Sequence, residues 1–253
     1  MGNLDPVDGK ERKLYTQKYS IVYRVQMKIQ LTNWVAYEIG VHVGDGNMYS
    51  YDRTHRITYS GNLANEKNFY KEFLAKLIEK IYRVKPHYHE RKEDNTVLLM
   101  VDKKELLQLK NKILGLPIGT KDKIEIPIKI RNNKKLIKWF MRGLGDTDFS
   151  LSFKKNRKGI HTEPRLELYT KSKKLFEQTK LILREFGFTF GEDEFKGKYK
   201  GFMIRIYGKR NLQLWLDNFG FSNPWILLKI KVWKKLGYFP IKKSFNELSK
   251  FVN

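Results

Sequence analysis

The chain has 253 residues, 41% of them hydrophobic, which allows one large or two small domains with a substantial core. It contains no cysteine and no apolar run near the roughly 20 residues that cross a bilayer, which excludes disulfides, thiolate metal sites and a membrane span. Lysine and arginine total 51 against 27 acidic residues, a net charge of +24 distributed along the whole chain. This charge predicts a polyanionic partner, foremost nucleic acid; a highly soluble basic surface or a membrane-surface protein are the alternatives.

Hydrophobic periodicity predicts two similar series of elements. The first comprises a helix at 34–43, strands at 47–53 and 56–60, a helix at 66–82, strands at 87–91 and 96–101, and a helix at 104–114. The second comprises a helix at 135–145, strands at 149–153 and 165–169, a helix at 173–186, strands at 189–194 and 202–207, and a helix at 211–219, followed by a basic helix at 225–236. A strand pattern at 20–31 stands apart. We therefore predict an N-terminal extension (1–31), a first unit (32–118), a polar linker (119–133) and a second unit (134–253).

Four pairs of segments match in the same order in the two halves, separated by 103 to 109 residues. The pairs are 38–46 with 141–149, 56–62 with 165–171, 98–106 with 204–212, and 114–117 with 219–222. A collinear series of this kind indicates an internal duplication. The predicted fold is thus α+β, built from two αββαββα units.

Two of the matched segments, Glu38–Gly46 and Met141–Phe149, join an apolar, glycine-bearing stretch to an aspartate, and they resemble the two motifs of the LAGLIDADG homing endonuclease family. Segments at 142–148, 170–173, 220–224 and 233–237 are similar to archaeal-type members with both repeats in one chain, so the resemblance covers about 34–243. It implies a monomer with a pseudo-twofold axis and two antiparallel sheets forming a DNA-binding saddle. It also implies a site-specific endonuclease that uses Mg²⁺ or Mn²⁺ to hydrolyse both strands of a long, pseudo-palindromic duplex.

The same resemblance implies that the two motif helices pack side by side and bring Asp45 and Asp148 together. Gly40 and Gly44 lie four residues apart on one helical face and would permit the close approach, and Gly143 and Gly145 would serve the second helix. Carboxylates at two helix C-termini repel each other and the helix dipoles, and divalent cations remove this penalty. We therefore expect Asp45 and Asp148 to be catalytic metal ligands. The carbonyls of Gly44 and Thr147 are expected as further ligands by resemblance, whereas Asp146 is expected to be structural.

A lysine at the end of the second strand is the third catalytic candidate. By resemblance, Lys171 would polarise the attacking water or stabilise the phosphate in the transition state; a phosphate clamp or a solvated lysine is the alternative. Its match in the first unit is Asn62, expected in a supporting position, and this asymmetry would make the cutting rates of the two strands unequal.

Strand alternation predicts which side chains face DNA in the major groove. The residues predicted to face DNA are Asn47, Tyr49, Tyr51, Arg53, Arg56, Thr58, Ser150, Ser152, Lys154, Arg165, Glu167, Tyr169, Arg205 and Tyr207.

Three residues depart from the family motif. Phe149 replaces its final glycine and is expected to disturb the turn after Asp148, while Glu38 and His42 interrupt the apolar pattern of the first motif. An alternative function is therefore a non-catalytic nucleic-acid binder on the same scaffold, either an intron maturase that binds RNA or a DNA-binding regulator. Because the first residues lack the apolar stretch of a secretory signal, we expect a cytoplasmic protein.

Overall fold

The computed structural model describes residues 30–197 and 200–252. The strand predicted at 20–31 lies outside this range apart from its last two residues. The first half contains α2 (Asn33–Asp45), β1 (Gly46–Tyr51), β2 (Thr54–Asn62), α3 (Leu63–Asn68), η1 (Phe69–Leu74), α4 (Ala75–Tyr82), β3 (His87–Arg91), β4 (Thr96–Asp102), α5 (Lys104–Gln108) and η2 (Leu109–Ile113). After α6 (Ile128–Arg131), the second half contains α7 (Lys134–Thr147), β5 (Phe149–Lys155), β6 (His161–Thr170), α8 (Lys173–Glu185), β7 (Phe190–Phe195), β8 (Gly201–Tyr207) and α9 (Gly208–Asn218), followed by α10 (Pro224–Leu236) and α11 (Phe245–Ser249).

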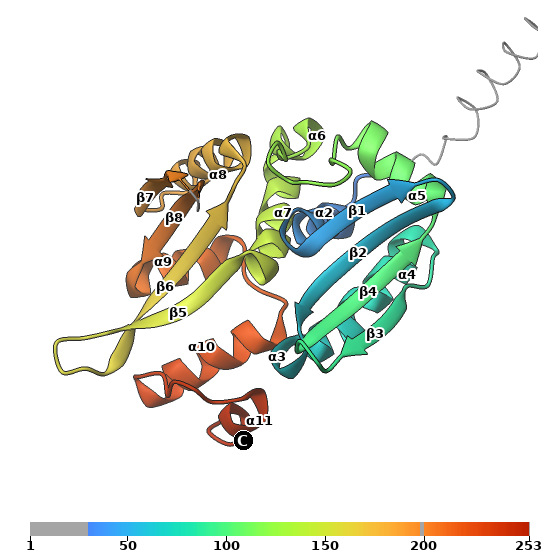
Figure 1. Ribbon diagram of the computed structural model, residues 1–253. Helices are drawn as coiled ribbons and strands as arrows, with labels where there is room; N and C mark the ends of the chain where they lie inside the picture. The colour runs from blue at the N-terminus through green and yellow to red at the C-terminus, as the bar shows by residue number, and fades with distance from the viewer. Residues whose placement is uncertain (1–29, 198–199, 253) are drawn as a thin grey trace, which may run out of the picture.

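Each half forms one four-stranded antiparallel sheet, in the orders β1-β2-β4-β3 and β5-β6-β8-β7. The two sheets lie on either side of α2 and α7, which run side by side in the middle of the molecule (Figure 1). The strand register also repeats, since Gly46 pairs with Tyr59 and Phe149 pairs with Leu168. The predicted duplicated α+β fold with two antiparallel sheets is confirmed.

Local sequence explains where the long helices begin. Thr32, Asn133, Ser172 and Asn223 stand at the N-caps of α2, α7, α8 and α10, and each side chain accepts a hydrogen bond from a backbone N–H of the first turn. The helix predicted at 66–82 occupies the predicted span but contains the π-helical segment η1 in its middle. The periodicity of apolar residues did not reveal this change of winding.

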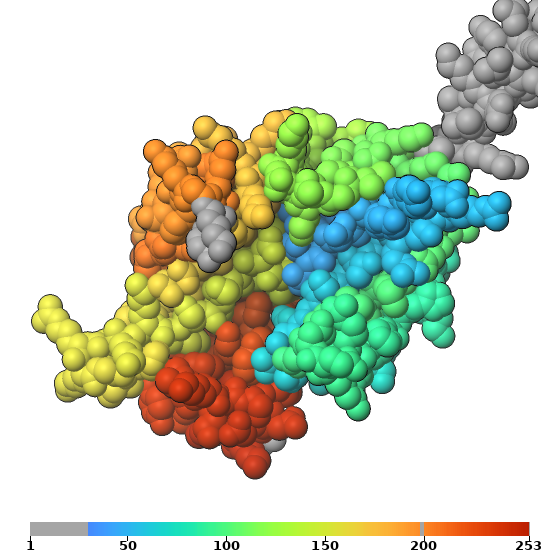
Figure 2. All heavy atoms as spheres, in the orientation of Figure 1, coloured from blue at the N-terminus to red at the C-terminus, as the bar shows by residue number. Residues whose placement is uncertain are grey.

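The connection between the two halves is more ordered than its polar sequence suggested. Ile124, Ile126 and Ile130 are buried, and the last of them belongs to the short helix α6. At the opposite edge, α10 and α11 form a C-terminal pair that lies between β5 and α3, and it fills the space between the two halves in Figure 2. Both junctions between the units are therefore covered by packed chain.

Candidate metal and nucleic-acid site

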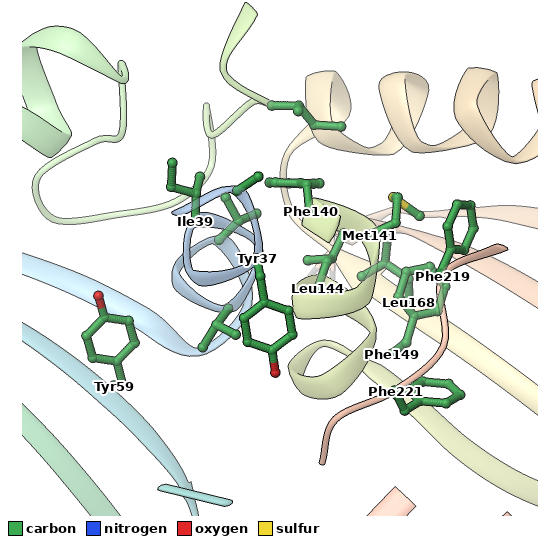
Figure 3. Packing of buried hydrophobic residues seen from close by; sticks show 14 of the residues in the cluster. Tyr37, Ile39, Tyr59, Phe140, Met141, Leu144, Phe149, Leu168, Phe219 and Phe221 are labelled. Carbon is green, nitrogen blue, oxygen red and sulfur yellow. The ribbon is translucent and has the colours of Figure 1, made fainter. Parts of the chain in front are cut away.

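The two motif helices approach so closely that side chains are not tolerated at the contact. A Cβ on Gly40 would lie 2.1 Å from the carbonyl oxygen of Phe140, and one on Gly143 would lie 2.1 Å from that of Tyr37. Figure 3 shows α2 and α7 side by side with Phe140 and Leu144 turned toward α2. Glycine is required at these two positions because backbone contacts backbone.

The remaining motif glycines differ. A Cβ on Gly44 would lie 2.0 Å from Oγ1 of Thr147, so Gly44 belongs to the helix contact as predicted. A Cβ on Gly145 would instead meet the ring of Trp215 at 2.6 Å. The prediction that Gly145 serves the helix contact is therefore wrong, since Gly145 makes room for an aromatic residue of its own half.

The two motif aspartates lie at the adjacent ends of these helices. Asp45 is the last residue of α2 and Asp148 is the C-cap of α7, and both are partly buried. Burial, together with the charge of Asp148, raises the pKa of Asp45 to about 8, although Tyr70 Oη donates to its carboxylate at 2.6 Å. Burial raises the pKa of Asp148 to about 6. The structure thus brings together two carboxyl groups whose negative charges are poorly compensated.

A cavity of about 400 Å³ opens beside Asp148. Its lining consists of Val43, Thr120, Lys121, Asp122, Ile124, Asp148, Tyr169, Thr170, Lys171 and Leu175. The cavity therefore combines one motif aspartate with the predicted Lys171 and with a second lysine, Lys121, that sequence reasoning missed.

Lys121 is held over the end of α2. Its Nζ donates to the carbonyl oxygens of Val43, at 3.1 Å, and of Gly44. Its charge lowers the pKa of both Asp45 and Asp148, against the larger effect of burial. A cation is thus accommodated where the helix C-terminus and the two carboxylates concentrate negative charge.

Hydrogen bonds on both sides fix the backbone around this lysine. Before it, Gly119 adopts a positive φ of 86° and donates its N–H to the carbonyl of Met48 in β1, at 2.8 Å. After it, the carbonyl of Ile124 accepts from Ser172 Oγ at 2.5 Å. The segment between β1 and α8 is therefore tied down on either side of Lys121, which fixes the backbone that carries this side chain.

Asn62 is the last residue of β2 and Lys171 follows directly after β6, and the structure uses them differently. The Asn62 side chain caps α3 by accepting from the N–H of Asn65 at 3.1 Å, whereas Ser172 caps the corresponding helix α8. The second half has one more residue at this junction, so Lys171 has no capping task and lines the cavity. The difference between Asn62 and Lys171 has this local cause, and unequal cutting of the two DNA strands stays a prediction.

Phe149 does not disturb the turn after Asp148. It begins β5 with the same register as Gly46 in β1, and its buried ring packs on Trp215 at 4.7 Å between ring centroids. In the first half the large and small residues are exchanged: the position of Phe149 is taken by Gly46, and a Cβ on Gly46 would lie 2.6 Å from Nδ1 of the buried His42. Each half thus has one large and one small residue at this contact, and Gly145 is the small partner of Phe149.

Asp146 is part of the scaffold. It is buried and accepts from Tyr37 Oη at 2.6 Å and from the N–H groups of Ser222 and Asn223 at 2.9 to 3.0 Å. Burial raises the pKa of Asp146 to about 7. Asn223 Nδ2 also donates to Glu66 in α3. Asp146 thus anchors the start of α10 to α7, and Asn223 links the same segment to the first half.

The sheet faces follow the predicted alternation. In β1, Asn47, Tyr49 and Tyr51 are exposed while Met48 is buried. The other predicted DNA-facing residues are exposed or half-buried, namely Arg53, Arg56, Thr58, Ser150, Ser152, Lys154, Arg165, Glu167, Tyr169, Arg205 and Tyr207. Their contacts with DNA remain predictions.

Several of the arginines on these faces are paired. Arg56 forms a two-pronged ion pair with Asp102 across the first sheet, at 2.7 and 2.8 Å. In the second sheet Glu167 lies between Arg165 and Arg205, with contacts of 2.8 and 3.1 Å. Paired arginines are oriented by their partners and keep further N–H groups for a ligand.

The donor set at the helix ends suits a hard divalent cation. Two carboxylates and the main-chain carbonyl of Gly44 offer only oxygen, which is what Mg²⁺ and Mn²⁺ prefer. The ammonium of Lys121 on that carbonyl shows that positive charge is stabilised there. Within the described residues, no cluster of three or more histidine or acidic side chains is arranged to hold a metal, so such an ion would depend on carbonyls and water as well.

The raised pKa values predict the pH dependence of stability. For Asp45 the folded pKa of about 8 lies above the ordinary value of 3.8, so the folded state retains a proton that the unfolded chain releases. Stability without metal should therefore fall as pH rises from about 5 to 7.5, and Asp45→Asn should gain roughly 1–2 kcal/mol at pH 7.5 after allowance for solvent screening. Urea unfolding in a chelator tests this, and a stability that rises over this interval in the wild type would contradict it.

The arrangement of paired helices between two four-stranded sheets is the LAGLIDADG fold. Solved structures with this arrangement include mesophilic variants of the homing endonuclease I-DmoI, at 19% identity over 75% of this chain and 96% of that chain with a TM-score of 0.54. I-DmoI in complex with DNA and Mn is 19% identical over 76% and 98% of the two chains, and the complex with DNA and Ca is 19% identical over 77% and 94%, both with a TM-score of 0.54. At this identity the likeness shows the fold. No family model and no curated protein sequence matches the chain.

None of the helices within residues 30–197 and 200–252 combines the length and apolar character needed to traverse a bilayer.

Proposed function

We propose that this protein is a metal-dependent, site-specific DNA endonuclease that binds duplex DNA as a monomer and hydrolyses both strands. The observation that carries the proposal is the placement of Asp45 and Asp148 at adjacent helix ends, between two sheets of a chain with net charge +24. The LAGLIDADG fold supports it, since I-DmoI on the same fold is a homing endonuclease with structures in complex with DNA. Stability alone does not explain two carboxyl groups brought together at such electrostatic cost.

The exposed faces of the two sheets would lie along the major groove, where base edges are distinguishable. Tyr49 and Tyr51 project from β1, and the ion-paired Arg56 and Arg205 present oriented donors. Lys154 carries positive charge at the far end of β5, where it suits a phosphate contact.

Asp45 and Asp148 would hold Mg²⁺ or Mn²⁺ together with the carbonyls of Gly44 and Thr147. A bound divalent ion would supply a more acidic water and charge stabilisation for the departing 3′-oxygen. Lys171, at the wall of the cavity beside Asp148, would donate to the developing negative charge on the phosphate. Tyr70 holds the Asp45 carboxylate in one orientation through its hydroxyl.

The function is tested by cleavage-site selection from randomised DNA duplexes with Mg²⁺. We expect enrichment of one long, partly symmetric sequence cut in both strands, and no cut products with the double variant Asp45→Asn, Asp148→Asn. If wild type and variant enrich the same bound sequence and neither cuts, the protein is a non-catalytic DNA binder. RNA binding in place of duplex binding would indicate a maturase.

DNA binding should depend steeply on salt. Neutralising phosphates releases counterions, so a protein with six or more lysine and arginine contacts should lose on the order of 10³-fold in affinity between about 50 and 200 mM salt. Fluorescence anisotropy with a labelled duplex measures this slope. A flat response would contradict binding through a basic saddle.

A further inference from the structure

Lys121 occupies the position that the proposed metal ligands require. Its Nζ donates to the carbonyl of Gly44, the same oxygen that is proposed to bind the metal, and to the carbonyl of Val43. It also lines the same cavity as Asp148. An ammonium group and a divalent cation on the same carbonyl oxygen would lie close together, and their positive charges would repel each other strongly.

We infer that Lys121 is a tethered placeholder cation that occupies the metal site in the metal-free, DNA-free protein and must leave Gly44 before a divalent ion binds there. The inference rests on the proposed function of the same site. The segment that joins the two halves would then control metal loading as well as linking them covalently.

The way the segment is anchored supports this assignment. The bonds of Gly119 to β1 and of Ile124 to Ser172 fix the backbone on either side of Lys121. A side chain with four rotatable bonds on a fixed backbone can move its ammonium group by several ångströms without unfolding the segment. The cavity beside Asp148, lined by Thr120 and Lys171 as well, provides space for the displaced group.

The placeholder also stabilises the protein without metal. The carbonyls of Val43 and Gly44 end α2 beside the two motif carboxyl groups, and Lys121 is a cation bonded to both carbonyls. Removing it should therefore weaken the metal-free fold and strengthen metal binding at the same time. These opposite effects separate a placeholder from a lysine that only contributes to packing.

The test is calorimetric titration of Mn²⁺ into the full-length protein without DNA, beside thermal melting in a chelator. We expect Lys121→Met to bind Mn²⁺ on the order of tenfold more tightly than wild type, since a site held shut for most of the time loses affinity in proportion. We expect its metal-free melting temperature at pH 7.5 to be lower by several degrees. Lys121→Arg, which keeps the charge, should remain close to wild type in both measurements.

The matched control is Lys171→Met, which removes the same charge from the same cavity. It should tighten Mn²⁺ binding much less, because Lys171 does not donate to Gly44 in the structure. Equal gains for the two methionine variants, or no gain for Lys121→Met, would overturn the placeholder role while leaving the metal site intact. If the double variant Asp45→Asn, Asp148→Asn binds Mn²⁺ as well as wild type, the proposed metal site itself fails, and the placeholder role fails with it.

Discussion

Replacing Asp45 and Asp148 by asparagine is expected to lower the rate of double-strand cleavage by at least about 10³-fold, because the ions that would activate water and stabilise the leaving oxygen lose their charged ligands. DNA affinity should stay within about tenfold of wild type, or rise, because negative charge is removed from a surface facing phosphates. Asparagine has nearly the same shape, so the hydrogen bond from Tyr70 to position 45 can persist. Cleavage and binding of the selected duplex are measured side by side.

The control for this experiment is Asp217→Asn, which changes one exposed carboxylate on α9 that accepts from Gln213 and does not line the cavity beside Asp148. It should cleave like the wild type. Cleavage that survives in the double variant, or that is lost only together with binding, would show that these carboxylates do not carry the reaction.

Breaking the buried ion pair between Glu38 and Lys110 should produce the largest loss of stability. Both side chains are fully buried, and Lys110 Nζ lies 2.7 and 2.8 Å from the two carboxylate oxygens. Tyr59 and Tyr82 donate their hydroxyls to the same carboxylate. Lys110→Met leaves an unpaired buried charge, so the free energy of unfolding should fall by roughly 3–5 kcal/mol.

The double variant Glu38→Gln, Lys110→Met should recover much of this loss. Gln carries no charge, and its amide can still hydrogen-bond the two tyrosine hydroxyls. Urea unfolding of both variants measures the difference. The exposed pair Glu72–Lys76 is the control, since Lys76→Met should change stability by less than about 0.5 kcal/mol. A Lys110→Met variant as stable as the wild type would show that the pair contributes nothing to the fold.

This network explains why the first motif departs from its apolar pattern. In the second half the matching position is Met141, which packs in an apolar cluster with Phe219 and Leu168 (Figure 3). In the first half, Glu38 is accepted only because Lys110 and two tyrosines from distant parts of the chain meet it. Single-residue patterns could not show this, because the partners come together only in the fold.

The elements and their order were predictable from the sequence because each half shows clear periodicity of 3.6 or 2 residues. Asn62 and Lys171 both stand at the end of the second strand of their half, but the extra residue that frees Lys171 from capping was not apparent. Lys121 carries no local signal, since it is one of many lysines in a polar stretch. Its role depends on a hydrogen bond to α2, more than 70 residues earlier in the chain.

The close approach of the helices was predicted through glycine spacing, and it holds for Gly40, Gly44 and Gly143. It fails for Gly145 because Gly145 is the small partner of Phe149 in the second half, as Gly46 is of His42 in the first. A motif compared one position at a time does not show which large and small residues pair. Phe149 appeared to be a defect when it was compared with the motif alone. Beside Trp215 and Gly145, it completes the core of the second half.

Sharing of cations by the two motif aspartates is tested most directly by a double-mutant cycle on Mn²⁺ binding, using calorimetry on wild type, Asp45→Asn, Asp148→Asn and the double variant, each with an uncleaved duplex. Carboxylates that act on common ions should be strongly coupled, so that the second substitution adds little to the loss caused by the first. Losses that add fully, each variant retaining an independent ion of its own, would contradict a common site between the two helices.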